Sequence, residues 1–434
     1  LWADEPGYYI AEFPVYNTIV AALYQLNGTV NETLGKLVSV FASLGAAVFL
    51  YLLVLRLFSK NTALAALIFF YLFSPQGIIL SRSYQPDELG LFFGIVGLYY
   101  FYLWTKTSKL VHYSISFVCF ILTLLVKISF FPFAFPMLFF AFKKWKLKMI
   151  FQPLFILYTA TIAPYFFWYL HMKNVYASYP QLHSADLISP GNWLKFNKLL
   201  DIHWLVNTVY DFIDQVATLP VIILFLGALL LKNRRNFGFI IAWSVGLAIY
   251  VLGFIGKIHF WYYQVPLLFP VVILAGVSAN ELLQYFKKHF VHSKIVIIFL
   301  IAISMFLTGR PYLLRTYAIS LRHKHLLEFA QTIQNETPLH GKILTSADTH
   351  AALTYYSLRP DMWGGTLTIN EPGCDNKCVI HRFEGFRAWG AQLYAVLDKK
   401  ELTGKPEFSQ YLHRHFPVVK ESETYILFSV VRKA

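Results

Sequence analysis

Residues 35–57 read GKLVSVFASLGAAVFLYLLVLRL, an apolar stretch with one lysine near its start and one arginine near its end. A helix needs about 20 mostly apolar residues to cross the hydrocarbon core of a bilayer, so this stretch predicts a transmembrane helix. Nine similar stretches follow. We expect ten spans, at about 35–57, 62–80, 87–105, 110–126, 128–142, 149–170, 219–231, 237–255, 264–284 and 294–309.

The overall composition also indicates a membrane protein. Hydrophobic residues make up 57% of the 434 positions and charged residues 14%, and the mean hydropathy is +0.52. Soluble domains average about 25% charged residues. The net charge of +14 does not indicate a nucleic-acid partner, because the basic residues stand in short loops and in the C-terminal region. The expected partner is the lipid bilayer.

Basic clusters fall in every second gap between the predicted spans, which gives the chain an orientation. Cytoplasmic loops are enriched in Lys and Arg, so these gaps are predicted to be cytoplasmic. An even number of spans then places residues 1–34, the long gap 171–218 and the tail after Arg310 on the extracytoplasmic side. The predicted location is a plasma membrane. The clusters are Arg56/Lys60, Lys106/Lys109, Lys143/Lys144/Lys146/Lys148, Lys232/Arg234/Arg235 and Lys287/Lys288/Lys294.

Three regions are expected. Residues 1–34 form the remnant of a first extracytoplasmic loop, with an interfacial helix at 14–26. Residues 35–310 form a transmembrane domain of about ten helices, with the large outer loop 171–218. Residues 311–434 have the composition of a small extracytoplasmic α/β domain. The fold class is therefore mainly α, a polytopic membrane protein with a C-terminal α/β domain.

Within the C-terminal region, helical patterns at 322–335 and 349–357 flank a short strand at 342–346. The terminal stretch FPVVKESETYILFSVV (416–431) predicts a hairpin of two strands. Cys374 and Cys378 stand in a turn-rich loop, where an oxidising compartment favours a local disulfide.

Several carboxylates lie at the predicted outer edge of the membrane, where charge is costly and needs a reason. Asp4 and Glu5 stand in WADEPGYY, and Glu12 begins EFPVYN. Asp87 and Glu88 follow Pro86 in SRSYQPDELGLFF. Acidic residues in the first turn of a helix are also favoured by its dipole alone. A functional role gains support because Arg82 is close in sequence and all these groups share one side of the membrane.

The order of these segments resembles the GT-C glycosyltransferases that use polyprenyl-phosphate sugars, in particular the protein O-mannosyltransferase and lipid A aminoarabinose transferase group. EFPVYN, the interfacial helix, the first span and SRSYQPDELGLFF follow one another as in that group. HFWYYQVPLLFP (259–270) resembles the outer mouth of a late span, and KILTSADTHAALTYYSLRP (342–360) the start of the extracytoplasmic domain.

The resemblance implies an active site between outer loops and helix ends, which a lipid phosphate sugar enters from the outer leaflet. Asp87 matches the second acidic position of the family, with Arg82 as its accompanying base. For the first acidic position the candidates are Asp4, Glu5 and Glu12. In relatives with such an EFP segment the acidic residue usually follows a first membrane helix upstream, and we expect this chain to begin after that helix.

The chemistry of such a transfer sets the remaining candidates. A carboxylate must accept the proton of the acceptor hydroxyl, and cations must hold the departing phosphate. We expect direct displacement with inversion. The candidates for binding the donor phosphate or sugar are Arg82, Glu88, Lys127, Lys257, His259, Tyr262 and Tyr263. Lys127 is equally explained as the mark of a helix turn, and the tyrosines as an interfacial aromatic belt.

Other functions stay open at this stage. No cofactor is required, although some relatives place a divalent metal among acidic outer-loop groups. The acceptor can be a protein hydroxyl, a lipid or a cell-envelope glycan. The alternatives are a polytopic transporter or flippase, a polysaccharide ligase for a lipid-linked glycan, and a membrane scaffold. Transporters bind substrate near the midplane, whereas the acidic residues here are predicted at the outer edge.

Overall fold

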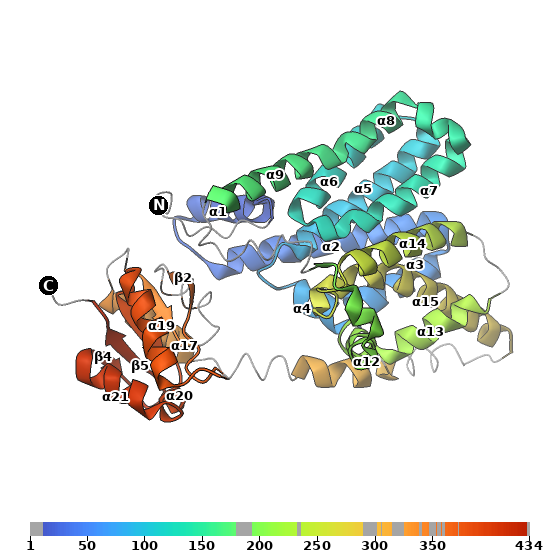
Figure 1. Cartoon of the computed structure of the whole chain (residues 1–434). Helices are drawn as coiled ribbons and strands as arrows, with labels where there is room; N and C mark the ends of the chain where they lie inside the picture. Colours follow the sequence, from blue (N-terminus) through green and yellow to red (C-terminus); the bar gives the residue numbers. More distant parts are fainter. Residues whose placement is uncertain are drawn as a thin grey trace. The chain divides into compact units, whose positions relative to one another are not determined.

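The computed structural model describes residues 12–178, 193–231, 236–289, 302–304, 306–314, 325–337, 341–346, 353, 357, 361–371 and 373–431. These residues form two compact units, a helical one up to residue 314 and a smaller one from Arg315 onward. Figure 1 shows the helices of the first unit and the mixed helices and strands of the second. Each unit is described by itself.

The helical unit is a bundle with several short or broken helices. Its elements are α1 (Val15–Asn27), α2 (Glu32–Leu57), α3 (Lys60–Tyr71), α4 (Pro75–Leu80), α5 (Asp87–Thr107), α6 (Leu110–Val126), η1 (Ile128–Phe133), α7 (Ala134–Trp145), η2 (Lys146–Phe151), α8 (Pro153–Thr159), η3 (Ala160–Ile162), α9 (Ala163–Ser178), η4 (Phe196–Leu200), α12 (Ile202–Asp211), η5 (Phe212–Ala217), α13 (Leu219–Leu229), α14 (Phe237–Gly253) and α15 (Trp261–His289). Residues 302–304 and 306–314 are also helical.

The bundle core is aromatic and closely packed. Helix α5 packs on α2 and α6, and α15 packs on α3 and α13. Fully buried rings such as Trp243, Phe133 and Phe269 lie in one large cluster. Glycines let backbones approach: a Cβ added at Gly276 would lie 2.8 Å from the carbonyl oxygen of Thr62. The two helices therefore meet at a spacing that only a glycine allows.

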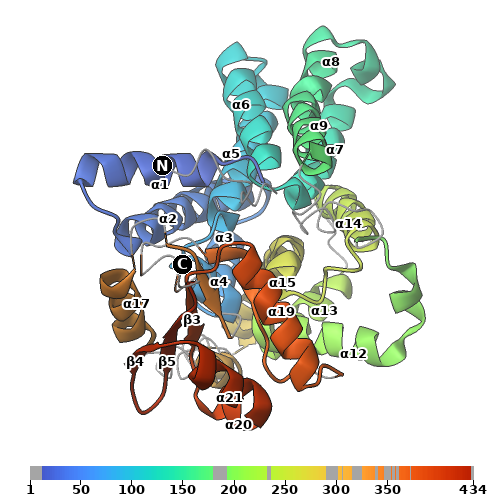
Figure 2. The same ribbon diagram turned by 60° about the vertical axis from the view of Figure 1, so that its left-hand side comes forward.

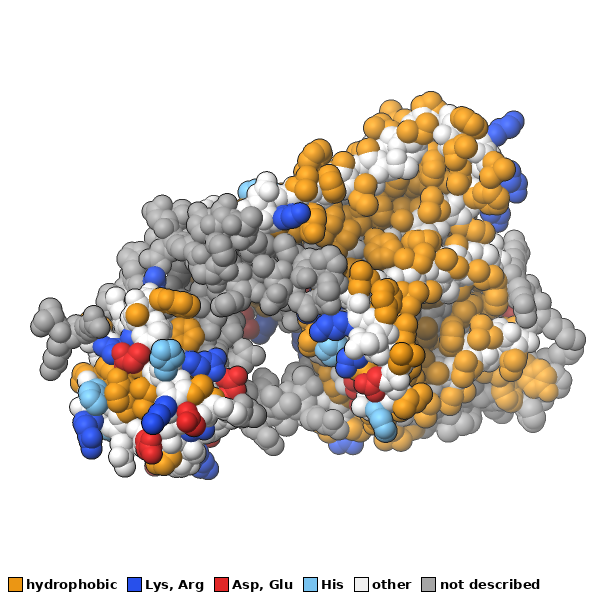
Figure 3. Space-filling view, in the orientation of Figure 1, with side chains coloured by type: hydrophobic (Ala, Val, Ile, Leu, Met, Phe, Trp, Pro, Cys, Tyr) orange, Lys and Arg blue, Asp and Glu red, His pale blue; other side chains and the backbone are white. Residues whose placement is uncertain are grey.

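The surface and helix lengths of this unit fit a bilayer. Among the described residues, four helical segments are long and apolar enough to cross a membrane, and a bent pair would add a fifth. The four are Glu32–Leu57, Asp87–Thr107, Pro153–Val175 and Tyr262–Lys287, and the bent pair is Ile202–Ala217 with Leu219–Leu229. Figure 3 shows apolar side chains covering most of the visible face of the unit.

Several predicted spans are interrupted, and prolines explain the breaks. The stretch 62–80 divides into α3 and α4, because Pro75 disfavours helical geometry at the preceding Ser74. Ser74 instead caps α4 by accepting a hydrogen bond from the Gly77 amide. Pro153 likewise begins α8 within the predicted span 149–170. The stretch 128–142 opens with a 3₁₀ turn that contains Pro132, and most of 294–309 lies outside the described residues.

The second unit contains a five-stranded sheet in the order β2-β1-β3-β5-β4. The first two pairings, β2 with β1 and β1 with β3, are parallel, while β3–β5 and β5–β4 are antiparallel. The C-terminal hairpin is present as β4 and β5. The elements are α17 (His325–Glu336), β1 (Ile343–Thr345), β2 (Asp361–Thr366), α19 (Asn376–Ala388), β3 (Leu393–Val396), α20 (Lys400–Thr403), α21 (Pro406–His415), β4 (Val418–Glu421) and β5 (Ile426–Ser429).

Helices cover both faces of this sheet (Figure 2). Alternate residues of a strand point to opposite faces. Tyr394 of β3 packs with Phe383 of α19 and Phe408 of α21. Its neighbour Leu393 packs in the other cluster, with α17. The predicted α/β class of this unit is confirmed. The predicted helix 349–357 falls mostly outside the described residues.

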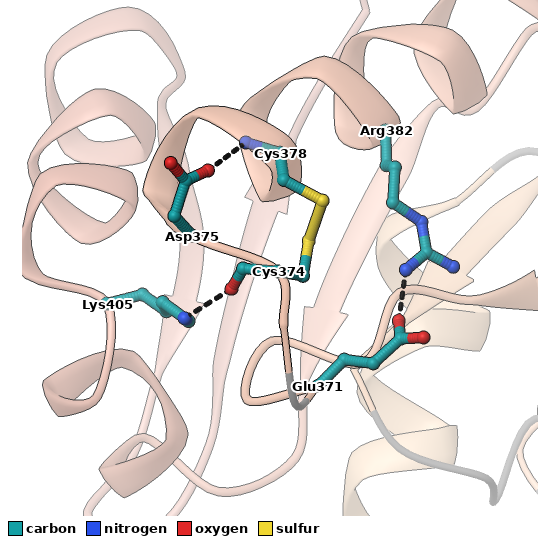
Figure 4. Close-up of a disulfide and its surroundings, with 6 residues drawn as sticks. All are labelled: Glu371, Cys374, Asp375, Cys378, Arg382 and Lys405. Atoms are coloured by element: carbon teal, nitrogen blue, oxygen red, sulfur yellow. Dashed lines mark hydrogen bonds and ion pairs between the residues drawn. A yellow bond between two sulfur atoms is a disulfide. The ribbon is translucent and has the colours of Figure 1, made fainter.

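A disulfide closes the turn before α19. Cys374 and Cys378 are bonded, with their Cα atoms 5.3 Å apart. Asp375 caps the helix by accepting a hydrogen bond from the Cys378 amide at 2.8 Å, and Lys405 donates to the Cys374 carbonyl at 2.5 Å (Figure 4). An ion pair between Glu371 and Arg382 spans the same turn. The third cysteine, Cys119, is free.

Candidate functional site

The segment that carries Glu12 is held against the end of α6. The amide of Phe13 donates to the carbonyl of Leu125 at 3.2 Å. The Phe13 ring packs edge-on against Trp168, with centroids 5.0 Å apart. Helix α1 then begins after Pro14 and is tied to α2 by the Tyr16 hydroxyl, which donates to the carbonyl of Gly35 at 2.8 Å. These contacts place Glu12 beside the C-terminal end of α6.

Asp87 is the first residue of α5, directly after Pro86. The positive end of the helix dipole stabilises a carboxylate at that position. The side chain is nevertheless buried, with 6% of its surface exposed. Because a buried charge is stable only with a partner, Asp87 requires a cation close by.

Lys127 supplies that cation. It follows the last residue of α6 in an extended conformation, and its backbone amide donates to the carbonyl of Thr123. Its Nζ lies 2.8 Å from Oδ1 of Asp87 and 4.0 Å from Oε1 of Glu12. The same ammonium group lies over the rings of Tyr262 and Tyr263, 4.6 and 5.0 Å from their centroids. Three segments, those of Glu12, Asp87 and the tyrosine pair, thus converge on the buried ammonium group that the end of α6 supplies.

We call Glu12, Asp87, Lys127, Tyr262 and Tyr263 the Lys127 cluster. Two carboxylates share one ammonium group, so the cluster carries one surplus negative charge when both are ionised. The backbone that carries the two tyrosines is held by the Tyr250 hydroxyl, which donates to the carbonyl of Tyr263 at 2.7 Å. A site of this kind can exchange a proton at Glu12, and its net charge is zero once Glu12 has taken up that proton.

The two carboxylates differ in exposure. The side chain of Glu12 keeps 38% of its surface accessible, whereas that of Asp87 is buried. Desolvation by the surrounding protein raises the pKa of Glu12 from 4.5 to about 7, although Lys127 lowers it. A carboxyl group with a pKa near neutral pH and an open side is suited to accept a proton.

Glu88 points into a different part of the bundle. It is 1% exposed, and neither carboxylate oxygen has a hydrogen-bond partner among the described residues. Neighbouring residues on a helix differ by about 100° in direction. Glu88 therefore faces the polar groups Ser43 of α2 and Tyr71 of α3 while Asp87 faces Lys127.

Lys257 and His259 belong to a second cluster, on the turn between α14 and α15. The amide of Gly256 donates to the carbonyl of Trp193 at 2.8 Å, and this bond brings the segment 193–200 to the turn. Burial and the charges of Lys257, Lys198 and Lys195 lower the pKa of His259. This imidazole is thus neutral at pH 7. Sequence reasoning did not single out Lys195 or Lys198, because their proximity to His259 depends on the fold.

The remaining predicted residues are placed as follows. Arg82 donates from Nε to the carbonyl of Ile78 at 3.1 Å, and its predicted role in binding the donor stays a prediction. Asp4 and Glu5 lie outside the described residues. Among the residues that the structure does describe, no group of three or more His, Cys, Asp or Glu side chains could hold a metal ion. The prediction of a divalent metal therefore stays open.

Residues 4–168, which include Glu12, Asp87 and Lys127, match the family of dolichyl-phosphate-mannose-protein mannosyltransferases. No curated protein sequence matches the chain.

Solved structures match over nearly the whole chain. ArnT from Cupriavidus metallidurans bound to undecaprenyl phosphate has a TM-score of 0.61 at 14% identity, covering 98% of this chain and 89% of ArnT. The Archaeoglobus fulgidus oligosaccharyltransferase in complex with Zn and sulfate has a TM-score of 0.59 at 11% identity, covering 98% and 65%. The same organism's AglB with an inhibitory peptide and a dolichol-phosphate has a TM-score of 0.57 at 11% identity, covering 98% and 67%.

The fold is therefore that of membrane proteins of the GT-C class. The likeness to ArnT and to the oligosaccharyltransferase confirms the fold class that the sequence predicted, and residues 4–168 match the mannosyltransferase family.

Proposed function

We propose that this protein transfers a sugar from a polyprenyl-phosphate donor to a hydroxyl acceptor at the Lys127 cluster, on the extracytoplasmic face of the membrane. The observation that carries the proposal is the convergence of Glu12, Asp87 and Tyr262 on one buried ammonium group. All three acidic and basic members lie in the segment that matches the mannosyltransferase family. The related structures contain undecaprenyl phosphate or dolichol-phosphate, which supports a donor of the same class.

In this proposal Glu12 is the general base. The acceptor O–H gives its proton to the Glu12 carboxylate while the oxygen forms a bond to C1 of the sugar. The bond between C1 and the phosphate oxygen breaks, and the electron pair leaves with the polyprenyl phosphate. Direct attack on the side opposite the leaving group inverts C1. The pKa of about 7 at Glu12 supports this role, because about half of the carboxyl groups are ionised at neutral pH and the carboxylate is basic enough to hold the proton that it accepts.

Lys127 is the proposed partner of the departing phosphate. Negative charge grows on that phosphate as the bond breaks, and a fixed cation stabilises it. Asp87 is a positioning residue that holds Lys127 at 2.8 Å and keeps it ionised in a buried place. Tyr262 and Tyr263 present ring faces beside the ammonium group, where a sugar ring can stack.

The position of the buried acids disfavours the transporter alternative. Transporters bind substrate near the midplane, often at broken helices. Asp87 and Glu88 both stand in the first turn of α5, at one end of a helix long enough to span the membrane.

The activity is tested by adding purified full-length protein to labelled polyprenyl-phosphate sugars with cell-envelope extracts as acceptors. We expect Glu12→Gln to lower the rate of sugar transfer by a factor of at least about 10². Glu281→Gln is the matched control, because Glu281 is exposed near the other end of α15. If Glu12→Gln and Glu281→Gln transfer sugar equally well, Glu12 is not the base.

The proposed face is tested separately by cysteine accessibility in a Cys119→Ser background. Single cysteines at Ser83, before α5, and Ser108, after α5, report on opposite ends of that helix. We expect a membrane-impermeant thiol reagent added outside cells to label position 83 and not 108. Labelling of 108 alone would place the Lys127 cluster on the cytoplasmic side and refute the proposed orientation.

A further inference from the structure

A polar hollow lies at the other end of the helices that build the Lys127 cluster. Its volume is about 390 Å³. Its polar lining comes from the C-terminal ends of α2, α5 and α7 and from the residue before α14, and includes Arg56, Tyr102, Lys106, Lys143, Lys144 and Asn236. We call this the basic hollow. Figure 3 shows Lys and Arg side chains gathered at the edge of the unit near α7 and α8.

Helix α5 gives the distance between the two sites. It begins at Asp87 in the Lys127 cluster and reaches Lys106 in the basic hollow. At a rise of 1.5 Å per residue, this separation is about 28 Å. That is close to the thickness of the hydrocarbon core of a bilayer, about 30 Å. The basic hollow therefore faces the leaflet opposite the Lys127 cluster.

The charge of the hollow is one-sided. Among the residues that the structure describes, four cationic side chains line it and no lining residue is acidic. Lys144 donates to the hydroxyl of Ser108 at 2.7 Å, and Lys106 lies over the ring of Tyr102 at 5.7 Å. Cations that converge on one space repel each other, and a bound anion removes this repulsion. The arrangement thus favours an anionic ligand with several acceptor oxygens, such as a phosphate ester.

The positive-inside rule accounts for basic residues in this loop but not for their convergence. A topology signal needs only positive charge near the membrane. Lys146 and Lys148 meet that need in the same segment without lining the hollow. The four cations that line the hollow come from three separate helices. Apolar side chains line the same hollow: Leu57, Phe140 and Phe239, which we call its apolar floor. Lysines that line the hollow can therefore be compared with Lys146 and Lys148, which do not.

We propose that the basic hollow binds the phosphate of an anionic phospholipid from the leaflet opposite the Lys127 cluster. The apolar floor and its surroundings favour a lipid over a free phosphate. Phe142 of α7 and Ile241 of α14, near the hollow in sequence, keep 44% and 62% of their surface exposed. Acyl chains can lie along such side chains while the headgroup phosphate meets the lysines. This site is independent of the proposed sugar transfer.

The test uses the full-length protein in neutral detergent and native mass spectrometry with three probes. These are dioleoyl-phosphatidylglycerol, dioleoyl-phosphatidylcholine and glycerol 3-phosphate. We expect the protein to retain phosphatidylglycerol in preference to the other two. The double variant Lys143→Gln/Lys144→Gln should bind it about tenfold to thirtyfold more weakly, as expected for two lost cations near an anionic headgroup. Arg56→Gln provides a second variant, on another helix.

The matched control is Lys146→Gln/Lys148→Gln, which removes the same charge from the same loop and should bind as the unmodified protein does. Equal weakening in both double variants would show unspecific attraction and overturn the proposal. Binding unchanged in Lys143→Gln/Lys144→Gln and Arg56→Gln would also overturn it. Glycerol 3-phosphate that competes fully with the lipid would show that the hollow takes a soluble phosphate instead.

Discussion

The ion pair between Asp87 and Lys127 gives the sharpest prediction, because its two members stand 40 residues apart and depend on the fold. We consider the single variants Asp87→Asn and Lys127→Met and the double variant that carries both. Asp87→Asn leaves Lys127 with only the more distant Glu12, and Lys127→Met leaves Asp87 without its cation. The double change removes both charges and leaves groups of similar size.

The expected magnitude follows from burial. The Lys127 and Asp87 side chains are 9% and 6% exposed, and the atoms of the pair are 2.8 Å apart. Breaking a buried pair by removing one partner costs about 3–5 kcal/mol, whereas replacing both partners is often close to neutral. Because Glu12 also lies 4.0 Å from Nζ, Lys127→Met leaves two carboxylates and should be the more damaging single change.

The assay is the free energy of unfolding in mixed detergent micelles, measured beside sugar transfer. We expect both single variants to be destabilised and the double variant to recover most of the lost stability while remaining inactive. Stability without activity would show that the pair serves the reaction and not only the fold. A double variant no more stable than Lys127→Met, or one that is fully active, would refute the reasoning.

Three further predictions follow from single features. If Glu12 is the base, its raised pKa means that the carboxyl is protonated below about pH 7, so the transfer rate should rise with pH through 7; Glu12→Gln should remove this rise from the residual rate. Gly276→Ala should cost about 1–3 kcal/mol of unfolding free energy, because its Cβ would lie 2.8 Å from a backbone oxygen, while Gly253→Ala, with nothing within 4 Å, should not destabilise. Replacing Cys374 and Cys378 by serine should destabilise the C-terminal unit by about 2 kcal/mol, because the disulfide no longer restricts this short loop in the unfolded chain. A thermal melt with and without reductant measures this loss. Equal stability of the serine variant and the oxidised parent protein would contradict this account.

Local patterns in the sequence predicted much of the fold. The helix expected at 14–26 is α1, and the stretch 110–126 is α6 with the same bounds. The disulfide and the C-terminal hairpin were also predicted, because both form between residues close in the sequence. The strand β3 was not predicted. Its pairing with β1 joins residues about 50 positions apart, which no local pattern reveals.

The candidate site was predicted as a set of residues but not as an arrangement. Arg82 was expected to accompany Asp87 as a base that binds the donor phosphate, and this role stays a prediction. The structure pairs Asp87 with Lys127, which comes from the end of α6. From the sequence alone, Lys127 was equally well explained as the mark of a turn between two helices. Two features of the sequence pointed to Lys127 as a site residue. It stands between two apolar stretches, and it is predicted on the same side of the membrane as Glu12.

The most direct measurement of the central claim is photocrosslinking to a radiolabelled polyprenyl phosphate. A photoreactive phenylalanine analogue replaces Tyr262, beside the Lys127 ammonium group, or Tyr102, in the basic hollow at the other end of the bundle. We expect label at position 262, and its loss when unlabelled polyprenyl phosphate is added in excess. Label at position 102 and none at 262 would contradict the assignment of the Lys127 cluster as the donor site.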